Sequence, residues 1–220
     1  MISEQSLNAY YAMRAPYYDE VYEKPERQAD IKFLREALTK RFMNCRVLEV
    51  ACGTGFWSQF IASSASQLVA TDALHEPLVL ARRKTNSASI QFEQADAYHL
   101  PSTLGMFESA FAGLFFSHVP ICSRRLFLAG LHKLMLPDAR VILIDNSEIQ
   151  CLEWPIIYRD EFGNTYQHRR TRDGAVHRVL KNFPTEAELR VVTNGIGENA
   201  QYRALDNFWM YEYTVTRAVS

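Results

Sequence analysis

The segment from Val47 to Gly55 limits the possible folds of this chain more than any other. It reads Val-Leu-Glu-Val-Ala-Cys-Gly-Thr-Gly, a short apolar run followed by two glycines with one residue between them. Glycine adopts positive φ angles without strain, and it lets a ligand approach the main chain where a Cβ atom would obstruct it. The pattern predicts a buried strand over residues 46–50, a tight turn at Gly53 and Gly55, and a helix beginning at about Phe56. A ligand is expected where the strand ends and the helix begins.

Short apolar runs alternate with longer stretches of helical period along the first two thirds of the chain. This alternation predicts a parallel sheet covered by helices on both faces. The expected helices are Ser3 to about Tyr22 with a break at Pro16, Pro25–Phe42, Phe56 to about Ala62, His75–Lys84, and Arg124–Leu136 ended by Pro137. The expected strands are Arg46–Val50, Gln67–Thr71, Ser89–Gln94, Glu108–Phe116 and Arg140–Ile144.

The last third of the chain has the signals of antiparallel pairing. Asn164–Thr171 and Ala175–Asn182 flank an Asp-Gly pair, which is typical of a β-hairpin. Thr185 and Glu188 have the spacing of a capping box and predict a helix toward Val192. Two further strands are expected on either side of Asp206 and Asn207, over Gln201–Leu205 and Phe208–Arg217. The prediction is an α/β, Rossmann-like three-layer sandwich: a mostly parallel seven-stranded sheet with a C-terminal antiparallel hairpin and a hairpin insertion.

Composition narrows the class of protein. The formal net charge is −1, whereas a nucleic-acid-binding protein usually carries a basic excess, so no nucleic-acid partner is expected. The four cysteines have no metal-ligand or Cys-x-x-Cys spacing, so neither a metal site nor a disulfide framework is expected. The sequence begins with a polar segment and has no apolar run of roughly 20 residues, so we expect a cytoplasmic protein without a membrane partner.

Acidic residues end three successive predicted strands. Glu49 lies on the first, Asp72 closes the second, and Asp96 with Ala97 follows the third. Asp72 can accept hydrogen bonds from ribose hydroxyls, and Asp96–Ala97 can recognise an adenine edge. Three acids suit a positively charged nucleoside and are unfavourable around a pyrophosphate. The dinucleotide pattern also fits poorly, since Ser58 stands where its third glycine belongs.

Four motifs in this order resemble the class I S-adenosylmethionine-dependent methyltransferase family, in its small-molecule type. They are Glu49-Val-Ala51-Cys-Gly53-Thr-Gly55, Ala-Thr-Asp72, Gln-Ala-Asp96-Ala97, and the segment Leu134–Asp145, which contains the expected strand Arg140–Ile144. The resemblance spans about residues 10 to 146. Family members usually have Lys-Pro-Gly-Gly before the last of these strands, and here Leu136-Pro137-Asp138-Ala139 replaces it. The geometry of that turn is therefore left open.

The resemblance implies that S-adenosylmethionine is the cofactor and that the chain forms one domain. Residues 1–45 would form helices that cover the cofactor, 46–146 the cofactor-binding core, and 147–220 the acceptor-side cap and edge strands. By the same likeness, Arg14 and Tyr18 would bind the methionyl carboxylate, and Glu49 would lie near the methionyl amine or the sulfonium. The full set of implied cofactor-binding residues is Arg14, Tyr18, Glu49, Ala51, Gly53, Gly55, Asp72, Ala73, Asp96, Ala97 and Phe115.

His118 is the candidate general base, because it follows the fourth predicted strand and a histidine titrates near neutrality. It lies in Ser-His-Val-Pro, which lacks the Pro-Pro-aromatic sequence that stacks on a flipped nucleic-acid base. Asn146 and its neighbour Asp145, after the fifth strand, are candidates for the acceptor pocket. Tyr158 and Tyr166, in the hairpin region with Arg169, are candidates for its cap or for a dimer contact.

The predicted function is methyl transfer from S-adenosylmethionine to an oxygen or nitrogen of a small acceptor. The aromatic content favours an aromatic acceptor, although these rings serve a core equally well. Three alternatives stay open: a non-catalytic S-adenosylmethionine-binding partner subunit, a protein methyltransferase, and, less favoured, an NAD-dependent oxidoreductase. A homodimer is also left open.

Overall fold

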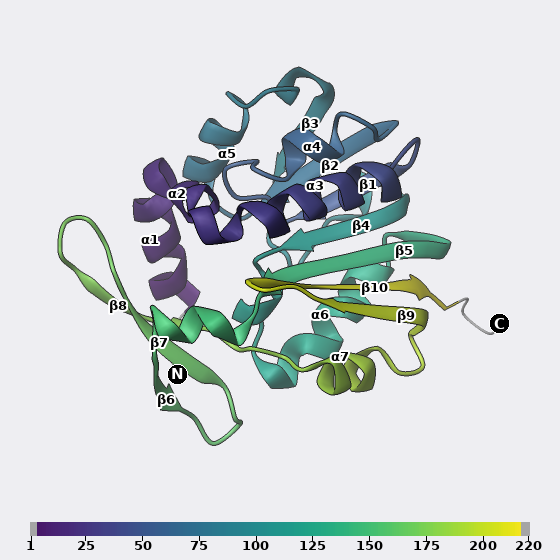
Figure 1. The fold of residues 1–220 in the computed structure, drawn as a ribbon. Helices are drawn as coiled ribbons and strands as arrows, with labels where there is room; N and C mark the ends of the chain where they lie inside the picture. The colour runs from purple at the N-terminus through teal and green to yellow at the C-terminus, as the bar shows by residue number, and fades with distance from the viewer. Residues whose placement is uncertain (1–3, 217–220) are drawn as a thin grey trace.

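A seven-stranded sheet forms the centre of the molecule (Figure 1). The computed structural model describes residues 4–216, so Ser3 and Arg217 of the predicted elements lie outside the described residues. The strand order is β3-β2-β1-β4-β5-β10-β9. Strands β1 to β5 are parallel, while β10 is antiparallel to both of its neighbours. The strands are β1 Arg46–Val50, β2 Gln67–Asp72, β3 Ile90–Gln94, β4 Phe107–Gly113, β5 Met135–Asn146, β9 Gly197–Ala204 and β10 Phe208–Val215. The predicted sheet, with its C-terminal antiparallel pair, is confirmed.

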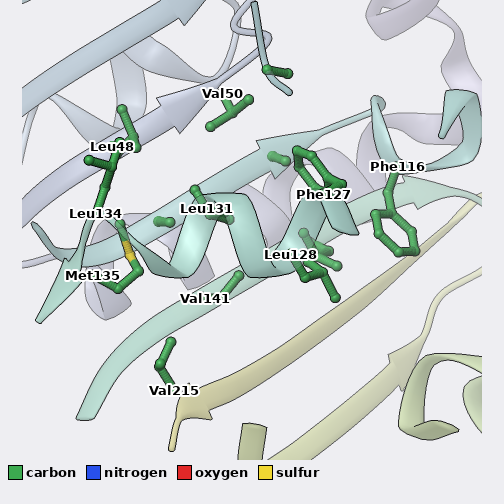
Figure 2. Close-up of a cluster of buried hydrophobic side chains, with 14 of the residues drawn as sticks. Leu48, Val50, Phe116, Phe127, Leu128, Leu131, Leu134, Met135, Val141 and Val215 are labelled. Atoms are coloured by element: carbon green, nitrogen blue, oxygen red, sulfur yellow. The ribbon is translucent and has the colours of Figure 1, made fainter. Parts of the chain in front are cut away.

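The helices pack on both faces of this sheet. They are α3 Gln28–Arg41, α4 Ser58–Ile61, α5 His75–Ala81, α6 Arg124–His132 and α7 Glu186–Thr193. Residues that alternate along a strand point to opposite faces. Accordingly Val47 belongs to the core under α3, α4 and α5, whereas Leu48 and Val50 belong to the core under α6 and α7. Figure 2 shows this second core, where Phe127, Leu128 and Leu131 of α6 lie against the strands.

The N-terminal segment forms short helices beside the carboxyl ends of the strands. They are α1 Glu4–Arg14, the 3-10 turn η1 Ala15–Tyr17, α2 Glu20–Glu23 and the 3-10 turn η2 Pro25–Arg27. The predicted break at Pro16 is confirmed. Asp19 connects this segment to the glycine turn, because its carboxylate accepts from the Thr54 hydroxyl and pairs with Lys84.

Several predicted boundaries in the second half of the chain are wrong, since β5 begins at Met135 rather than Arg140 and β9 begins at Gly197 rather than Gln201. Strand β4 ends at Gly113 rather than Phe116, because Leu114 has a φ of 57° and the 3-10 turn η5, Phe116–His118, follows. Helix α6 ends at His132 rather than Leu136, so Pro137 does not end it. Pro137 lies instead in the exposed start of β5, where the register with β4 shifts and Asp138 has a φ of 62°. Such an irregularity tolerates proline in a strand.

The hairpin insertion is a separate three-stranded antiparallel sheet. Strands β7 Thr165–Arg170 and β8 Val176–Leu180 pair around the predicted Asp-Gly turn. The sequence did not predict β6 Ile156–Arg159, which pairs with the outer edge of β7 and is exposed along its length. This second sheet lies next to α1, at the same end of the molecule as the N-terminal helices (Figure 1).

A buried ion pair attaches the second sheet to the central sheet. The Lys181 ammonium, just after β8, donates to the Asp145 carboxylate at 2.8 Å and to the Ser117 hydroxyl at 2.7 Å. Both charged side chains are almost fully buried, 3% and 0% exposed. Burial raises the pKa of Asp145, but Lys181 more than offsets this, so the pKa lies below its ordinary value. The main-chain N–H of Asn182 also donates to the Ser117 carbonyl.

Helix α7 begins with the predicted capping box, since the Thr185 hydroxyl accepts from Glu188 and the Glu188 carboxylate accepts from Thr185. None of the helices within residues 4–216 is long and apolar enough to cross a lipid bilayer.

Replacing Lys181 with methionine should destabilise the fold strongly, because Asp145 would stay buried without its counter-charge. We expect a loss of roughly 3–5 kcal/mol in the free energy of unfolding, measured by urea denaturation. The matched control is Lys24→Met, which removes an ion pair to Glu153 whose side chains are 31% and 45% exposed. The control should cost at most about 1 kcal/mol. Equal losses in the two variants would contradict the assigned role of the buried pair.

Candidate active site

A cavity of about 1320 Å³ lies where the parallel strands end. It is bounded by the N-terminal helices, the glycine turn, the loops after β2, β3 and β4, and the second sheet. A pocket for one small ligand usually measures about 300–1,000 Å³. This cavity therefore has room for two ligands side by side.

The glycine turn forms one wall of this cavity. Ala51, Gly53 and Gly55 all have positive φ angles, of 54°, 56° and 76°. A Cβ atom added to Gly53 would meet no atom within 4 Å, so this position faces open space. A Cβ atom on Gly55 would lie 2.9 Å from that of Ala81, so Gly55 allows α5 to pack against the turn rather than a ligand to approach. The helix after the turn is shorter than predicted, a single turn over Ser58–Ile61.

Asp72 holds the turn in place from the end of β2. Its Oδ2 atom accepts from the Gly53 N–H at 2.8 Å, and its Oδ1 atom accepts from the Leu74 N–H at 2.9 Å. The side chain is nearly buried yet lines the cavity. Burial raises the pKa of Asp72 above its ordinary value, although these backbone donors oppose the shift. The carboxylate oxygens keep lone pairs with which to meet a ligand.

Glu49 is a buried acid that also lines the cavity. Its Oε2 atom has no hydrogen-bond partner among the described residues. Burial, together with the negative charge of Asp72, raises the pKa of Glu49 to about 8. A buried acid with an unpartnered oxygen on a cavity wall is suited to a positively charged ligand, which would favour its ionised form. The acids and the open space at Gly53 thus fit S-adenosylmethionine.

Asp96 and Ala97 lie on the cavity wall after β3. The Asp96 carboxylate accepts from the Tyr98 N–H at 2.9 Å and pairs with His99 at 2.7 Å. These contacts fix the orientation of the carboxylate at the rim of the cavity.

The structure gathers twelve of the fifteen predicted site residues around one cavity. These are Tyr18, Glu49, Ala51, Gly53, Asp72, Ala73, Asp96, Ala97, Phe115, His118, Tyr158 and Tyr166. Gly55 packs behind the turn instead. Arg14 also lies off the cavity wall, since its guanidinium donates to the Tyr10 hydroxyl at 2.9 Å and covers the Tyr18 ring.

Asn146, a predicted acceptor-pocket residue, is also absent from the cavity wall. It is buried within the sheet, where its N–H donates to Asp145. Asp145 itself is committed to Lys181, so neither residue points into the cavity. The structure therefore does not place the end of β5 on the wall of this cavity, and an acceptor contact by Asn146 stays a prediction.

His118 is held on both sides of its ring. Its Nδ1 atom lies 2.6 Å from the Leu180 carbonyl oxygen, and its Nε2 atom lies 2.7 Å from the Tyr11 hydroxyl. Burial, reinforced by the positive charge of Lys181, lowers the pKa of His118 to about 3. The imidazole is therefore neutral around pH 7.

The second sheet supplies part of the cavity wall. Tyr158 and Tyr166 line it, and the Tyr166 hydroxyl donates to Asp160 at 2.9 Å. The Arg178 guanidinium lies over both rings, 5.6 and 5.5 Å from their centres. Arg169, which the sequence placed with these tyrosines, is instead buried over the Trp154 ring and donates to Gln167.

The cavity and support residues that escaped the sequence analysis include Tyr11, Arg178 and Lys181. Tyr11 is one of a run of aromatic residues before Pro16, and nothing in that run distinguishes it from its neighbours. Lys181 could have been found by its position, as a lone lysine between Leu180 and Asn182 at the end of a strand.

Residues 47–138 match the family model described as a methyltransferase domain. No curated protein matches the sequence significantly. Among solved structures, the chain is similar to DhpI in complex with SAH, at 22% identity and a TM-score of 0.81 over 97% of both chains. A DhpI complex with SAM and HEP gives 22% identity and a TM-score of 0.80, over 97% of this chain and 99% of that one.

The N-methyltransferase NodS from Bradyrhizobium japonicum WM9 is more distant, at 11% identity and a TM-score of 0.61, over 89% of this chain and 99% of NodS. At these identities the likeness concerns the fold, and the matched family model spans the glycine turn and the acids that line the cavity. The chain therefore has the class I methyltransferase fold, and its residues 47–138 match a methyltransferase domain.

Proposed function

We propose that this methyltransferase transfers the methyl group to an oxygen or nitrogen atom of a small molecule that binds at the second-sheet end of the cavity. The observation that carries the proposal is that two unlike groups of side chains line one cavity. The parallel strands present Glu49, Asp72 and Asp96, and the second sheet presents the rings of Tyr158 and Tyr166. The ternary DhpI complex, which contains HEP in addition to SAM, is consistent with a cofactor and a second ligand in such a fold.

The acid-lined end would hold the cofactor. Glu49 would face its positive charge, Asp72 would accept from the ribose hydroxyls, and Asp96 with Ala97 would recognise the adenine. Tyr18 and Phe115 line the same cavity and would cover the nucleoside. The Arg14 side chain would have to change rotamer and break its hydrogen bond to the Tyr10 hydroxyl in order to bind the methionyl carboxylate.

When bound, S-adenosylmethionine supplies a methyl group that its sulfonium makes strongly electrophilic. The protein then has to hold an acceptor atom close to that methyl group and aligned with it, which accounts for a large part of the rate in such reactions. The N-terminal helices and the second sheet enclose the cavity and reduce its contact with water. His118, neutral at pH 7, is able to accept the proton that an acceptor hydroxyl or ammonium gives up.

The affinity for S-adenosylmethionine should rise with pH up to about 8 and level off above it. The Glu49 carboxyl has a pKa of about 8 in the free protein and is mostly neutral at pH 7. A cationic ligand stabilises the ionised form, so binding releases a proton, and the association constant should rise by up to about tenfold per pH unit. Calorimetric titrations from pH 6 to pH 9 would measure this.

The Glu49→Gln variant should lose this pH-dependent component, while Glu198→Gln on the exposed strand β9 should follow the wild type. Identical pH dependence in wild type and Glu49→Gln would show that Glu49 does not face the positive charge.

Replacing Asp72 with asparagine should weaken the binding of S-adenosylhomocysteine. Charge-assisted hydrogen bonds to the ribose would be lost, at a cost on the order of 1–3 kcal/mol. Asp206→Asn, which makes the same charge change in the exposed turn before β10, is the control. Unchanged affinity in Asp72→Asn would exclude the ribose assignment.

The acceptor class is best tested by measuring S-adenosylhomocysteine release. We expect turnover with at least one class in a panel of phenols, hydroxyquinolines, amines and carboxylates. If no small molecule supports release while the cofactor binds normally, the proposed acceptor class is wrong. Release with a protein substrate alone would indicate a protein methyltransferase instead.

A further inference from the structure

Tyr11 occupies a position that no other phenol within residues 4–216 shares. It projects from α1 into the cavity wall, and its hydroxyl lies 2.7 Å from the His118 Nε2 atom. Its ring packs edge-on against both Tyr10 and His118. Contacts with Tyr10 and His118 therefore hold the Tyr11 ring in place. The ring lies where the N-terminal helices, the loop after β4 and the second sheet meet.

The hydrogen-bond partners of His118 determine which atom carries its proton. The Leu180 carbonyl can only accept, so the Nδ1 atom at 2.6 Å must be the donor. In a neutral imidazole the Nε2 atom is then an acceptor, and Tyr11 donates its hydroxyl proton to it. The only lone pair of the ring is thus taken, and a molecule in the cavity cannot reach His118 while Tyr11 is in place.

The Tyr11 oxygen, by contrast, still has lone pairs with which to accept. We propose that Tyr11 is the catalytic residue that touches the acceptor, and that it relays the acceptor's proton to His118. This inference deepens the proposed function and rests on it. It replaces a histidine acting alone with a tyrosine–histidine relay.

The step balances without any further reactant. The acceptor oxygen forms its bond to the methyl carbon as the bond from that carbon to sulfur breaks, and the electron pair of that bond stays on sulfur. The acceptor hydroxyl proton moves to the Tyr11 oxygen, and the Tyr11 proton moves to His118 Nε2. The positive charge that leaves the sulfonium thus reappears on the imidazole ring, whose Nδ1–H stays bonded to Leu180.

The charged groups around His118 allow the ring to be protonated briefly during turnover but disfavour a permanently protonated ring. Lys181 and Arg169 disfavour a positive ring, while Asp145 favours it. The low pKa of His118, about 3, keeps the ring neutral at pH 7 and makes it release the proton to solvent after turnover.

The chain also contains a matched control. Tyr213 of β10 forms a similar pair with His132, its hydroxyl 2.8 Å from the Nε2 atom, and neither residue lines the cavity. Tyr213→Phe and Tyr11→Phe therefore remove the same kind of hydrogen bond at two different places.

The test compares methyl transfer to two phenols in wild type, Tyr11→Phe, His118→Ala, the double variant and Tyr213→Phe. One phenol keeps its proton at the assay pH, and the other is already ionised. General-base catalysis contributes roughly 10²–10⁴-fold, so we expect Tyr11→Phe to lower kcat for the protonated phenol by at least about tenfold. For the ionised phenol the decrease should be less than about threefold, since no proton has to be moved.

The double variant should be no slower than the slower single variant, because both residues act in one relay. Tyr213→Phe should keep the wild-type kcat for both phenols. Affinity for S-adenosylhomocysteine, measured by calorimetry, should be the same in Tyr11→Phe and wild type.

Two results would overturn the relay while leaving the proposed function intact. One is a wild-type kcat in Tyr11→Phe, and the other is an equal loss with both phenols, which would indicate a structural role. If the wild type methylates neither these phenols nor any member of the wider panel, the proposed function itself fails, and the relay fails with it.

Discussion

The proposed acceptor half of the active site depends on one buried ion pair, between Asp145 and Lys181. Asp145 is the penultimate residue of β5, and Lys181 follows the last strand of the second sheet. Removing two charges from water is costly, and their mutual attraction offsets that cost only when the geometry is good and further hydrogen bonds are made. Here Ser117 and the backbone N–H of Asn146 complete the arrangement. Ser117 neighbours His118, so this same contact fixes the loop that carries the histidine.

The two halves of the cavity are built in different ways. The cofactor half consists of strand ends and a glycine turn, whose positions follow from the parallel sheet itself. The acceptor half combines three segments that are far apart in the sequence: α1 with Tyr11, the loop after β4 with His118, and the second sheet with Leu180 and Arg178. Such a division lets a family keep one cofactor while the acceptor changes, because the acceptor side rests on segments outside the central sheet.

Most of the predicted cofactor-binding residues line one cavity for a physical reason. Strand periodicity, the glycine turn and the acids at strand ends are local signals, and parallel strands bring their carboxyl ends together without further information. The acceptor half depends on partners that no local pattern reveals. Asp145 was expected to point into the cavity because Lys181, 36 residues later, could not be foreseen as its partner. Strand β6 was missed because it is exposed on both faces and has no alternation of polar and apolar residues. Leu114 ended β4 early through a backbone angle that its side chain does not favour.

The two glycines of the turn are subject to different constraints. Gly55 is required by the protein itself, because any side chain there would collide with Ala81. Gly53 meets no protein atom, and Ala51 in the same turn has nearly the same φ angle with a Cβ atom present. A descendant of this chain that abandoned its cofactor would therefore still be selected to retain Gly55, whereas Gly53 could drift to other small residues. Among distant relatives, the identity of the residue at the Gly53 position is thus the better marker of a working cofactor site.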